Sequence, residues 1–184
     1  MLLSESSSGG IVDASEVDRA IGGYIDEFFA IRTVPQIDRW AAENVYLPRR
    51  VSAFEGFVNF ELTPWAREPV NSLNDPEVRN EIGIYGTQLS KTTQALVVLA
   101  AAVALRRQNV VWMWPSTEMG RSFSQSRWQP VVDASPALRS LKPTDDDLFK
   151  NLEQHFQTAT VNFIGSHSRV QAKSRPAPII IVDE

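Results

Sequence analysis

Three short apolar runs in the second half of the chain limit its fold more than any other feature. Residues 110–114 (VVWMW), 160–164 (TVNFI) and 179–182 (IIIV) are almost entirely apolar or β-branched. Such runs are typical of strands that are buried on both faces of a sheet. A further short strand is expected at residues 81–85 (EIGIY). Because helical patterns separate these runs, we predict an α/β fold whose mostly parallel sheet is flanked by helices.

Helical patterns account for much of the remaining sequence. Residues 16–31 carry apolar side chains at helical spacing, and residues 37–45 form a second, shorter helix. Pro64 begins a helix that runs to about Leu73, with Thr63 as its N-cap. Residues 47–59 are expected to form an extended connector. Other helical stretches are expected at residues 92–107, 119–132, 136–141 (a turn or short helix) and 147–156.

Composition excludes several classes of protein. The 184 residues are 43% hydrophobic and 22% charged, with no Cys and two His, as in an ordinary globular protein. Disulfide frameworks, thiolate metal sites and cysteine nucleophiles are therefore excluded. The net charge of −4 does not fit a uniformly basic nucleic-acid coat. The longest apolar run without a charge, residues 95–105, is well short of the ~20 residues that a membrane-spanning helix needs.

The chain is expected to divide into three parts. Residues 1–14 begin with a Ser/Gly-rich stretch that lacks the pattern of a secretory signal, and we interpret them as a flexible tail. Residues 15–62 form an N-terminal helical and connector segment. Residues 63–184 form the α/β core.

The segment that follows the expected strand at residues 81–85 has the layout of a Walker A phosphate loop. This phosphate loop (residues 86–93) reads Gly86-Thr87-Gln88-Leu89-Ser90-Lys91-Thr92-Thr93 and leads into a long helix. Backbone N–H groups at a helix N-terminus bind phosphate, Lys91 can reach the β- and γ-phosphates, and the Thr92 hydroxyl can coordinate Mg²⁺. The consensus G-x-x-x-x-G-K-[ST] is not met, because Ser90 precedes the lysine and Gly86 lies one position late. An ordinary strand-to-helix turn with a surface lysine stays the alternative.

The end of the chain supplies an acidic partner for this loop. Four β-branched residues, Ile179 to Val182, are followed by Asp183 and Glu184, as in a Walker B strand. Asp183 would hold Mg²⁺, and Glu184 would polarise the attacking water as the catalytic base. Asp183 follows Lys91 by 92 residues (183 − 91), with strands and helices between them. The two motifs together predict a P-loop ATPase core of the ASCE type that binds ATP and Mg²⁺.

In its order of short motifs, the chain resembles the large, motor subunit of tailed-phage terminases of the lambda type. The similarity covers most of residues 35–184. Its pieces are residues 63–69 (TPWAREP), 73–78 (LNDPEV), 86–92 (GTQLSKT), 114–117 (WPST), 122–124 (SFS), 127–130 (RWQP), 135–138 (SPAL), 164–168 (IGSHS) and 173–176 (KSRP). Each piece is unspecific by itself, whereas their order and spacing together are specific.

The resemblance implies an ATPase that drives DNA packaging. Such subunits translocate double-stranded DNA into procapsids, work as a homo-oligomeric ring at the portal protein with a small terminase subunit, and act in the host cytoplasm. They also carry a nuclease domain, so we expect this chain to be an N-terminal fragment that stops after its Walker B strand. An arginine finger is expected from Arg121, Arg127 or Arg175, since Thr87 occupies the position where some motors carry arginine.

Two other functions fit the same core. One is a helicase-like, nucleic-acid-dependent ATPase, and the other is a non-hydrolysing assembly module derived from such a domain. Three tryptophans bear on the site: Trp65 is expected in the core rather than stacked on adenine, and Trp112 and Trp114 are expected to pack in the core. Whether Mg-ATP binds separates the assembly module from the two ATPases.

Overall fold

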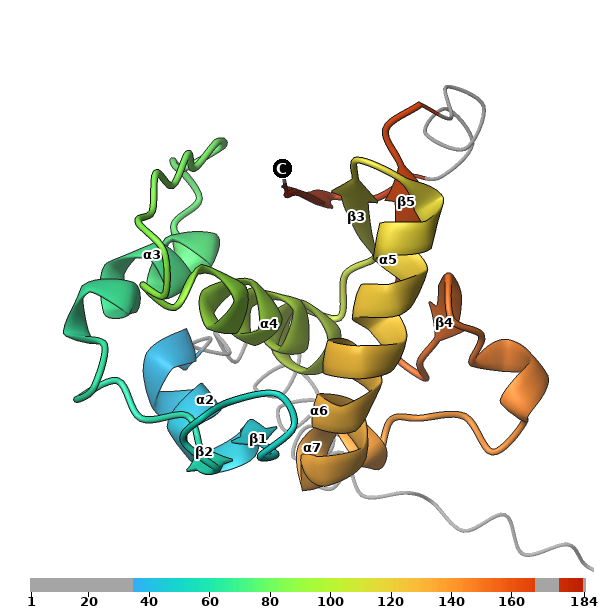
Figure 1. Ribbon diagram of the computed structural model, residues 1–184, viewed down its shortest axis with the longest axis horizontal. Helices are drawn as coiled ribbons and strands as arrows, with labels where there is room; N and C mark the ends of the chain where they lie inside the picture. Colours follow the sequence, from blue (N-terminus) through green and yellow to red (C-terminus); the bar gives the residue numbers. More distant parts are fainter. Residues whose placement is uncertain (1–34, 168–175, 184) are drawn as a thin grey trace, which may run out of the picture. The chain divides into compact units, whose positions relative to one another are not determined.

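A four-stranded sheet forms the centre of the structure, a computed structural model that describes residues 35–167 and 176–183 (Figure 1). Its strands are β3 (Val110–Trp114), β4 (Glu153–His155), β5 (Thr160–Gly165) and β6 (Ile179–Val182). Their order is β4-β5-β3-β6, with β3 parallel to β5 and β6 and only β4 antiparallel. The mixed α/β class, the mostly parallel sheet and the three apolar strands are therefore confirmed.

Helices occur at most of the predicted places. They are α2 (Ile37–Asn44), α3 (Arg67–Asn71), α4 (Lys91–Ala101), α5 (Thr117–Phe123), α6 (Gln129–Ala134) and α7 (Pro136–Arg139). A π-helical segment, Ala102–Arg106, extends α4, and another, Ser124–Trp128, joins α5 to α6. The predicted helix from Pro64 is broken, because short 3-10 turns precede and follow α3 and Thr63 makes no capping hydrogen bond.

The connector expected at residues 47–59 overlaps a small β-hairpin. Its strands β1 (Tyr46–Leu47) and β2 (Gly56–Phe57) pair antiparallel. The compact unit that contains all these elements runs from Val34 to Glu184. The predictions for the tail (1–14) and the helix at 16–31, and those for Arg175 and Glu184, lie outside the described residues.

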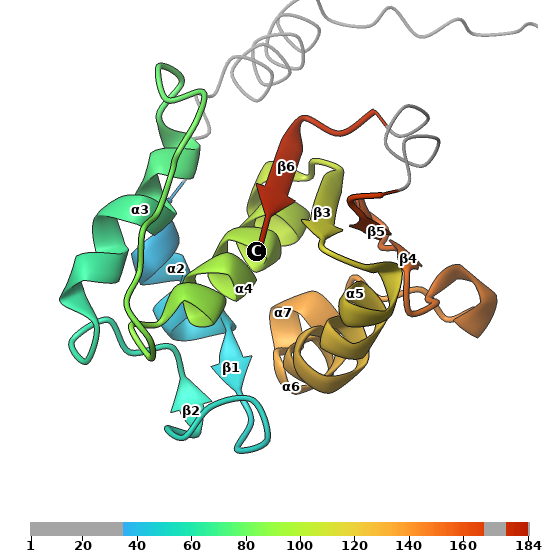
Figure 2. The same cartoon turned by 45° about the horizontal axis from the view of Figure 1, so that its top comes forward.

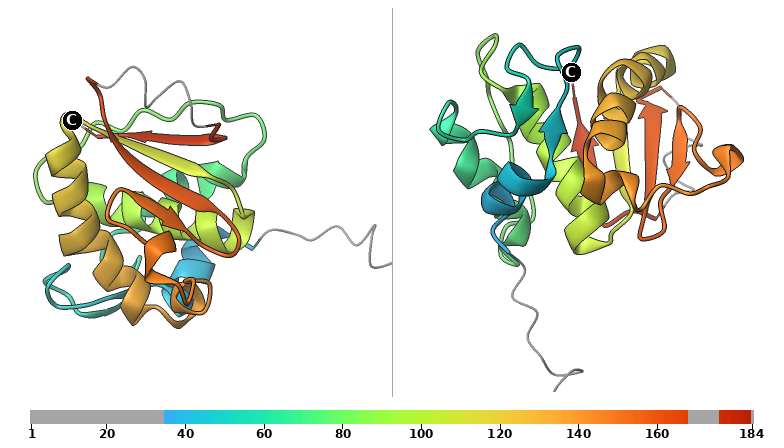
Figure 3. Two further views of the ribbon diagram at one scale, coloured as in Figure 1. Left: turned by 90° about the vertical axis from the view of Figure 1, so that its right-hand side faces the viewer. Right: turned by 90° about the horizontal axis from the view of Figure 1, so that it is seen from below.

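One face of the sheet carries the aromatic core. Trp112 and Phe163 are in register on β3 and β5, and both rings pack against Phe123 of α5. Trp114, stacked on Trp112, extends the same cluster. Trp112 and Trp114 are buried, at 1% and 7% exposure, which confirms their predicted place in the core. Figure 3 shows α4 and the α5–α6 pair lying along the sheet.

The sheet is less covered at β6 than the apolar pattern predicted. Ile180 and Val182, which alternate with Ile179 and Ile181, are 62% and 64% exposed. β6 is also the last strand in the sheet order, so it pairs on one side only, with β3. The expectation that the IIIV strand is buried on both faces is therefore wrong for β6.

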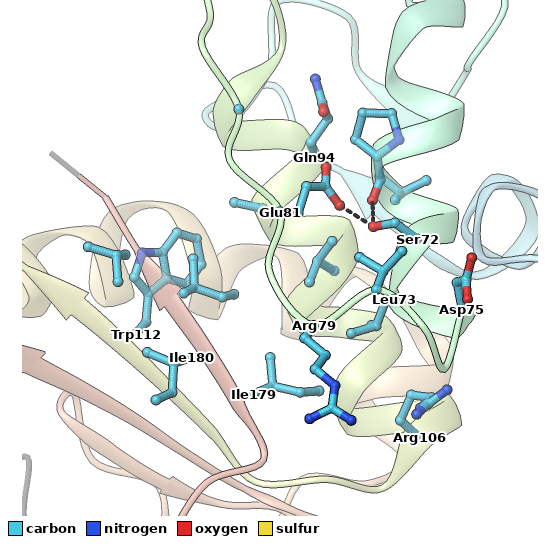
Figure 4. A pocket seen from close by; sticks show the side chains of 18 of the residues that line it. Ser72, Leu73, Asp75, Arg79, Glu81, Gln94, Arg106, Trp112, Ile179 and Ile180 are labelled. Atoms are coloured by element: carbon cyan, nitrogen blue, oxygen red, sulfur yellow. Dashed lines mark hydrogen bonds between the residues drawn. The ribbon is translucent and has the colours of Figure 1, made fainter.

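The strand predicted at residues 81–85 does not form. The segment is extended and largely exposed, and it pairs with no described strand. The side chain of Ser72 donates a hydrogen bond to Glu81, and the Tyr85 hydroxyl donates one to Gln94. A cavity of about 490 Å³, lined by residues of this segment and of β6, lies next to it (Figure 4). These side-chain contacts hold the segment where no neighbouring strand is available.

The helical stretch predicted at residues 147–156 is also wrong. A single 3-10 turn, Asp146–Leu148, is followed by β4, which pairs with β5. The reason lies in Gln154, which is fully buried and bonded to side chains of the segment that joins α5 to α6: it accepts from the Trp128 indole and donates to the Ser124 hydroxyl.

Within residues 35–167 and 176–183, none of the helices is both long and apolar enough to span a bilayer.

Candidate functional site

The two halves of the predicted site meet in the structure. The Lys91 ammonium, at the first residue of α4, lies 2.5 Å from the Asp183 carboxylate. The Lys91 side chain is 47% exposed and that of Asp183 is 16% exposed, so the pair faces solvent from the lysine side. Residues 92 positions apart therefore place a cation and a carboxylate in one ion pair.

The sheet explains why Asp183 lies at this place. β6 runs parallel to β3, and the Asp183 amide continues the ladder by donating to the Met113 carbonyl. The carboxyl end of β6 points toward α4 (Figure 2). In open α/β sheets, ligands bind outside the carboxyl ends of the strands, which is where this carboxylate emerges.

The neighbouring strands add polar groups at the same edge. After β3, the Ser116 side chain caps α5 by accepting from the Met119 amide. After β5, the Ser166 amide donates to the Trp114 carbonyl and its hydroxyl to the Pro115 carbonyl. Gly165 fits here because a Cβ atom would lie 2.8 Å from the Thr117 amide nitrogen. The strand ends are thus tied to one another around the edge that carries Asp183.

The phosphate loop (residues 86–93) has an unusual backbone. Gln88 and Ser90 both have φ of 62°, in the left-handed region that glycine adopts at least cost. Ser90, which stands where the Walker A consensus has glycine, is the N-cap residue of α4. The left-handed turn at Ser90 precedes α4 directly, and the backbone N–H of Gln94 donates to the Ser90 carbonyl in the first hydrogen bond of the helix.

The left-handed conformation of Ser90 predicts that glycine at this position gives a more stable protein than alanine, the reverse of their order inside a helix. Ser90→Ala removes the hydroxyl and keeps Cβ, whereas Ser90→Gly removes both. In a left-handed position glycine avoids a steric cost of about 1 kcal/mol, so Ser90→Gly should be more stable than Ser90→Ala by about that amount. Urea denaturation of both variants measures the difference. Equal stability, or a more stable alanine variant, would contradict a left-handed residue 90.

The buried side chain of Gln94 forms hydrogen bonds to the phosphate loop. Gln94, only 5% exposed, donates from Nε2 to the Ser90 hydroxyl at 3.1 Å and, in a longer contact, to the Leu89 carbonyl at 3.5 Å. Its Oε1 accepts from the Tyr85 hydroxyl at 2.9 Å. Sequence reasoning missed Gln94 and Tyr85. The available signal was one amide in the first turn of an otherwise apolar helix, since helix α4 continues as Ala-Leu-Val-Val-Leu-Ala-Ala.

Burial and a nearby charge act on Tyr85. Desolvation raises the pKa of the Tyr85 phenol above its ordinary value of 10.0, and the negative charge of Glu81 raises it further. The hydroxyl therefore keeps its proton, and its hydrogen bond to Gln94, throughout the neutral pH range.

Trp65 does not lie in the core, contrary to expectation. Its side chain is 51% exposed, and its indole N–H donates to the Leu89 carbonyl at 3.4 Å. Arg67, which follows in α3, is bonded to Asp38 and to Glu61. The tryptophan thus lies beside the loop, whereas the neighbouring guanidinium is occupied by two carboxylates.

The oxygen ligands suit a magnesium ion that is shared with a nucleotide. Asp183 supplies a carboxylate at the strand edge, and Thr92 supplies a hydroxyl in the first turn of α4. The described residues contain no group of three or more acidic or His side chains that could hold a metal by themselves. Mg²⁺ in phosphate-transfer sites takes one or two protein oxygens and completes its shell with phosphate and water. The residues present fit that pattern.

The arginines proposed as fingers are not gathered at the loop. Arg127 donates from Nη1 to the Val51 carbonyl, in the connector between β1 and β2. Arg121 is exposed in α5. No hydrogen bond or ion pair joins either of them to the phosphate loop in the part of the chain that the structure describes. Arg175 lies outside it.

Comparison with known protein families identifies this part of the chain. The sequence model of the family described as phage terminase large subunit gpA, ATPase domain, matches residues 52–184. This range contains the phosphate loop, the whole central sheet and Asp183. No curated protein and no solved structure matches the chain.

Proposed function

Because the chain belongs to the family of the phage terminase large subunit gpA, ATPase domain, we propose that it is the nucleotide-binding part of a DNA-packaging motor of the ASCE class. The family match bears out the resemblance found in the sequence. In this proposal, residues 86–93 hold the phosphates of Mg-ATP, and hydrolysis drives the movement of double-stranded DNA. The observation that carries the proposal is the ion pair between Lys91 and Asp183, at the carboxyl edge of a mostly parallel sheet.

The ion pair supports this proposal for an electrostatic reason. In the nucleotide-free chain, the positive charge of Lys91 is balanced by Asp183, whose Oδ1 lies 2.5 Å from the lysine Nζ. When ATP binds, the Lys91 ammonium can contact the β- and γ-phosphates instead of Asp183. The Asp183 carboxylate would then be free to bind Mg²⁺. The N-terminus of α4, which has no acidic residue in its first turn, adds a favourable dipole and free N–H groups.

Each residue then has a separate task. The ammonium of Lys91 offsets negative charge on the phosphates, and the first-turn amides of α4 orient them. Bound Mg²⁺ would neutralise phosphate charge, with Thr92 and Asp183 as its protein ligands. Glu184, next in sequence, is proposed to accept the proton of the water that attacks the γ-phosphorus, as the bond to the β–γ bridging oxygen breaks. An arginine finger supplied by Arg121, Arg127 or Arg175 would come either from the same chain or from a neighbouring subunit of a ring.

The partners and location follow from the family and are proposed with it. They are double-stranded DNA, the portal protein and a small terminase subunit, in the cytoplasm of the phage's host. Binding to the DNA backbone would weaken steeply with salt, because phosphate contacts release counterions. ATP hydrolysis is proposed for the full-length protein.

Asp183→Asn tests the proposed function. The variant cannot neutralise Lys91 or bind Mg²⁺ strongly, so Mg²⁺ should strengthen ATP binding about tenfold or more in the wild type and less than twofold in the variant. ATP without Mg²⁺ should bind the variant at least as tightly as the wild type, because the competing anion is gone. Calorimetric titrations with and without Mg²⁺ measure both effects.

The matched control is Asp133→Asn. Asp133 also pairs with a lysine, Lys142, but on the surface beside α6 and α7. This variant should keep the wild-type dependence on Mg²⁺. An unchanged Mg²⁺ dependence in Asp183→Asn, or no ATP binding by the wild type, would contradict the proposed site.

A further inference from the structure

We propose that Gln94 is the positioning residue of the phosphate loop, and that it fixes the loop in its phosphate-binding form through the Tyr85–Gln94–Leu89/Ser90 bridge. The inference rests on the proposed function and goes one step beyond it. It assigns to a side chain outside the Walker motifs control of how tightly the chain holds the phosphates of a nucleotide.

The loop needs an external support because its own backbone provides little. Residues 86–89 are exposed, and no strand precedes them in the sheet. Two of its non-glycine residues, Gln88 and Ser90, are held in the left-handed region. Each such residue is in a conformation that side chains with a Cβ atom disfavour, and it persists only where the surroundings fix it. Some contact must therefore supply the free energy that holds them there.

The Gln94 amide makes contacts on both sides of the loop. Its carbonyl oxygen accepts from Tyr85, the residue before the loop, and its NH₂ group donates to Leu89 and Ser90, the last two residues before α4 begins. The two donors and the acceptor of one amide are thus distributed over both ends of the segment. Figure 4 shows Gln94 above Glu81, next to the chain segment that leads into the loop.

The contacts also fix which way the amide faces. A flipped amide would point Oε1 at the Leu89 carbonyl, and two acceptors repel each other. Because Gln94 is 5% exposed, water cannot replace a lost partner readily, and hydrogen bonds of this kind are costly to leave unmade. Trp65, half exposed, gives the Leu89 carbonyl a second donor, but no hydrogen bond joins Trp65 to Tyr85 in the part of the chain that the structure describes. Gln94 is thus the side chain that joins the two ends.

The test uses two readouts and a matched control. Gln94→Met keeps the length of the side chain and removes its hydrogen bonds. In the nucleotide-free chain, amide hydrogen exchange at residue 94, whose N–H donates to the Ser90 carbonyl and so reports on the loop, should become at least tenfold faster, while the amides of β3 keep their protection. Mg-ATP should bind about tenfold more weakly, as expected from the loss of one or two net hydrogen bonds. Gln129→Met, which removes an amide bonded to Asn151 away from the loop, should change neither quantity.

Tyr85 provides an internal check. Tyr85→Phe should speed loop exchange by a smaller factor, and it should add nothing in the Gln94→Met background because Tyr85 acts on the loop through Gln94. If Gln94→Met does not fold, Gln94→Glu replaces it. That variant keeps the acceptor for Tyr85, loses the donor to Leu89, and should give the same faster loop exchange.

The possible results separate this inference from the proposed function. Equal loop exchange in the wild type and in Gln94→Met overturns the inference, whatever the nucleotide data show. Faster exchange in β3 as well as in the loop also overturns it, because it indicates a purely structural role. If the wild type binds no Mg-ATP but the loop alone loosens in Gln94→Met, the proposed function fails while the support of the loop by Gln94 stands.

Discussion

Glu184→Gln in the complete subunit is expected to abolish ATP hydrolysis while leaving ATP binding intact. Glutamine has nearly the same shape as glutamate but cannot accept the proton of the attacking water. General-base catalysis contributes about a hundredfold to ten-thousandfold, so turnover should fall by at least a hundredfold. Binding depends on the phosphate loop and Mg²⁺ ligands, so the dissociation constant for Mg-ATP should stay within about twofold. Steady-state phosphate release and calorimetry measure the two quantities.

Glu77→Gln is the matched control for this prediction. Glu77 is exposed in the turn after α3, where its backbone amide donates to the Asp75 side chain. Its substitution should leave turnover unchanged. Hydrolysis by Glu184→Gln at the wild-type rate would remove Glu184 from the role of catalytic base, and the residue that accepts the proton would then have to be sought elsewhere.

Lys91→Ala is expected to remove measurable binding of Mg-ATP to the chain. The substitution deletes the ammonium that faces the phosphates and leaves Asp183 unpaired beside them. Loss of attraction and gain of repulsion act in the same direction, so affinity should fall at least a hundredfold, which corresponds to about 2.7 kcal/mol. Calorimetric titration with Mg-ATP measures the loss, and thermal unfolding without nucleotide reports whether the fold is kept.

Lys142→Ala serves as the comparison for Lys91→Ala. Lys142 also forms an ion pair, with Asp133, so its removal tests the general cost of deleting a paired lysine. It should leave Mg-ATP binding unchanged. Wild-type affinity in Lys91→Ala would mean that residues 86–93 are an ordinary turn with a surface lysine, the alternative that the sequence left open.

The sequence predicted the three apolar strands, because runs of apolar and β-branched residues favour strands, although the burial expected for β6 was wrong. Their pattern can be recognised from the local sequence alone. All three strands pair in parallel, with β3 between β5 and β6. The same ladder brings Asp183 to Lys91, as the topology of an α/β sheet requires. This part of the site was therefore accessible from motif order alone.

The errors arise where distant contacts decide the structure. The alternating residues of 81–85 favour a strand locally, but a strand needs a partner, and side-chain bonds to Ser72 and Gln94 hold the segment outside the sheet. Leu148, Leu152 and Phe156 recur at helical spacing. Burial of Gln154 against Trp128 instead favours β4. Neither contact can be deduced from a local window of sequence.

The loop shows a third kind of limit. A motif identifies Lys91 and Thr92 by type and position, but it does not describe backbone angles or supporting contacts. The left-handed conformation of Ser90 and the bridge through Gln94 depend on the folded geometry. Trp65 was misplaced for a related reason, since helical spacing does not distinguish a core position from one beside an exposed loop.

Hydrogen exchange with and without Mg-ATP tests the central claim most directly, because it locates the ligand on the wild-type chain. We predict slower exchange at the amides of residues 86–93 and at the carboxyl end of β6, with little change in β1, β2 or α7. Lys91→Ala should show no such protection under the same conditions. Protection confined to other elements, or the same protection in Lys91→Ala, would contradict a nucleotide site built from the phosphate loop and Asp183.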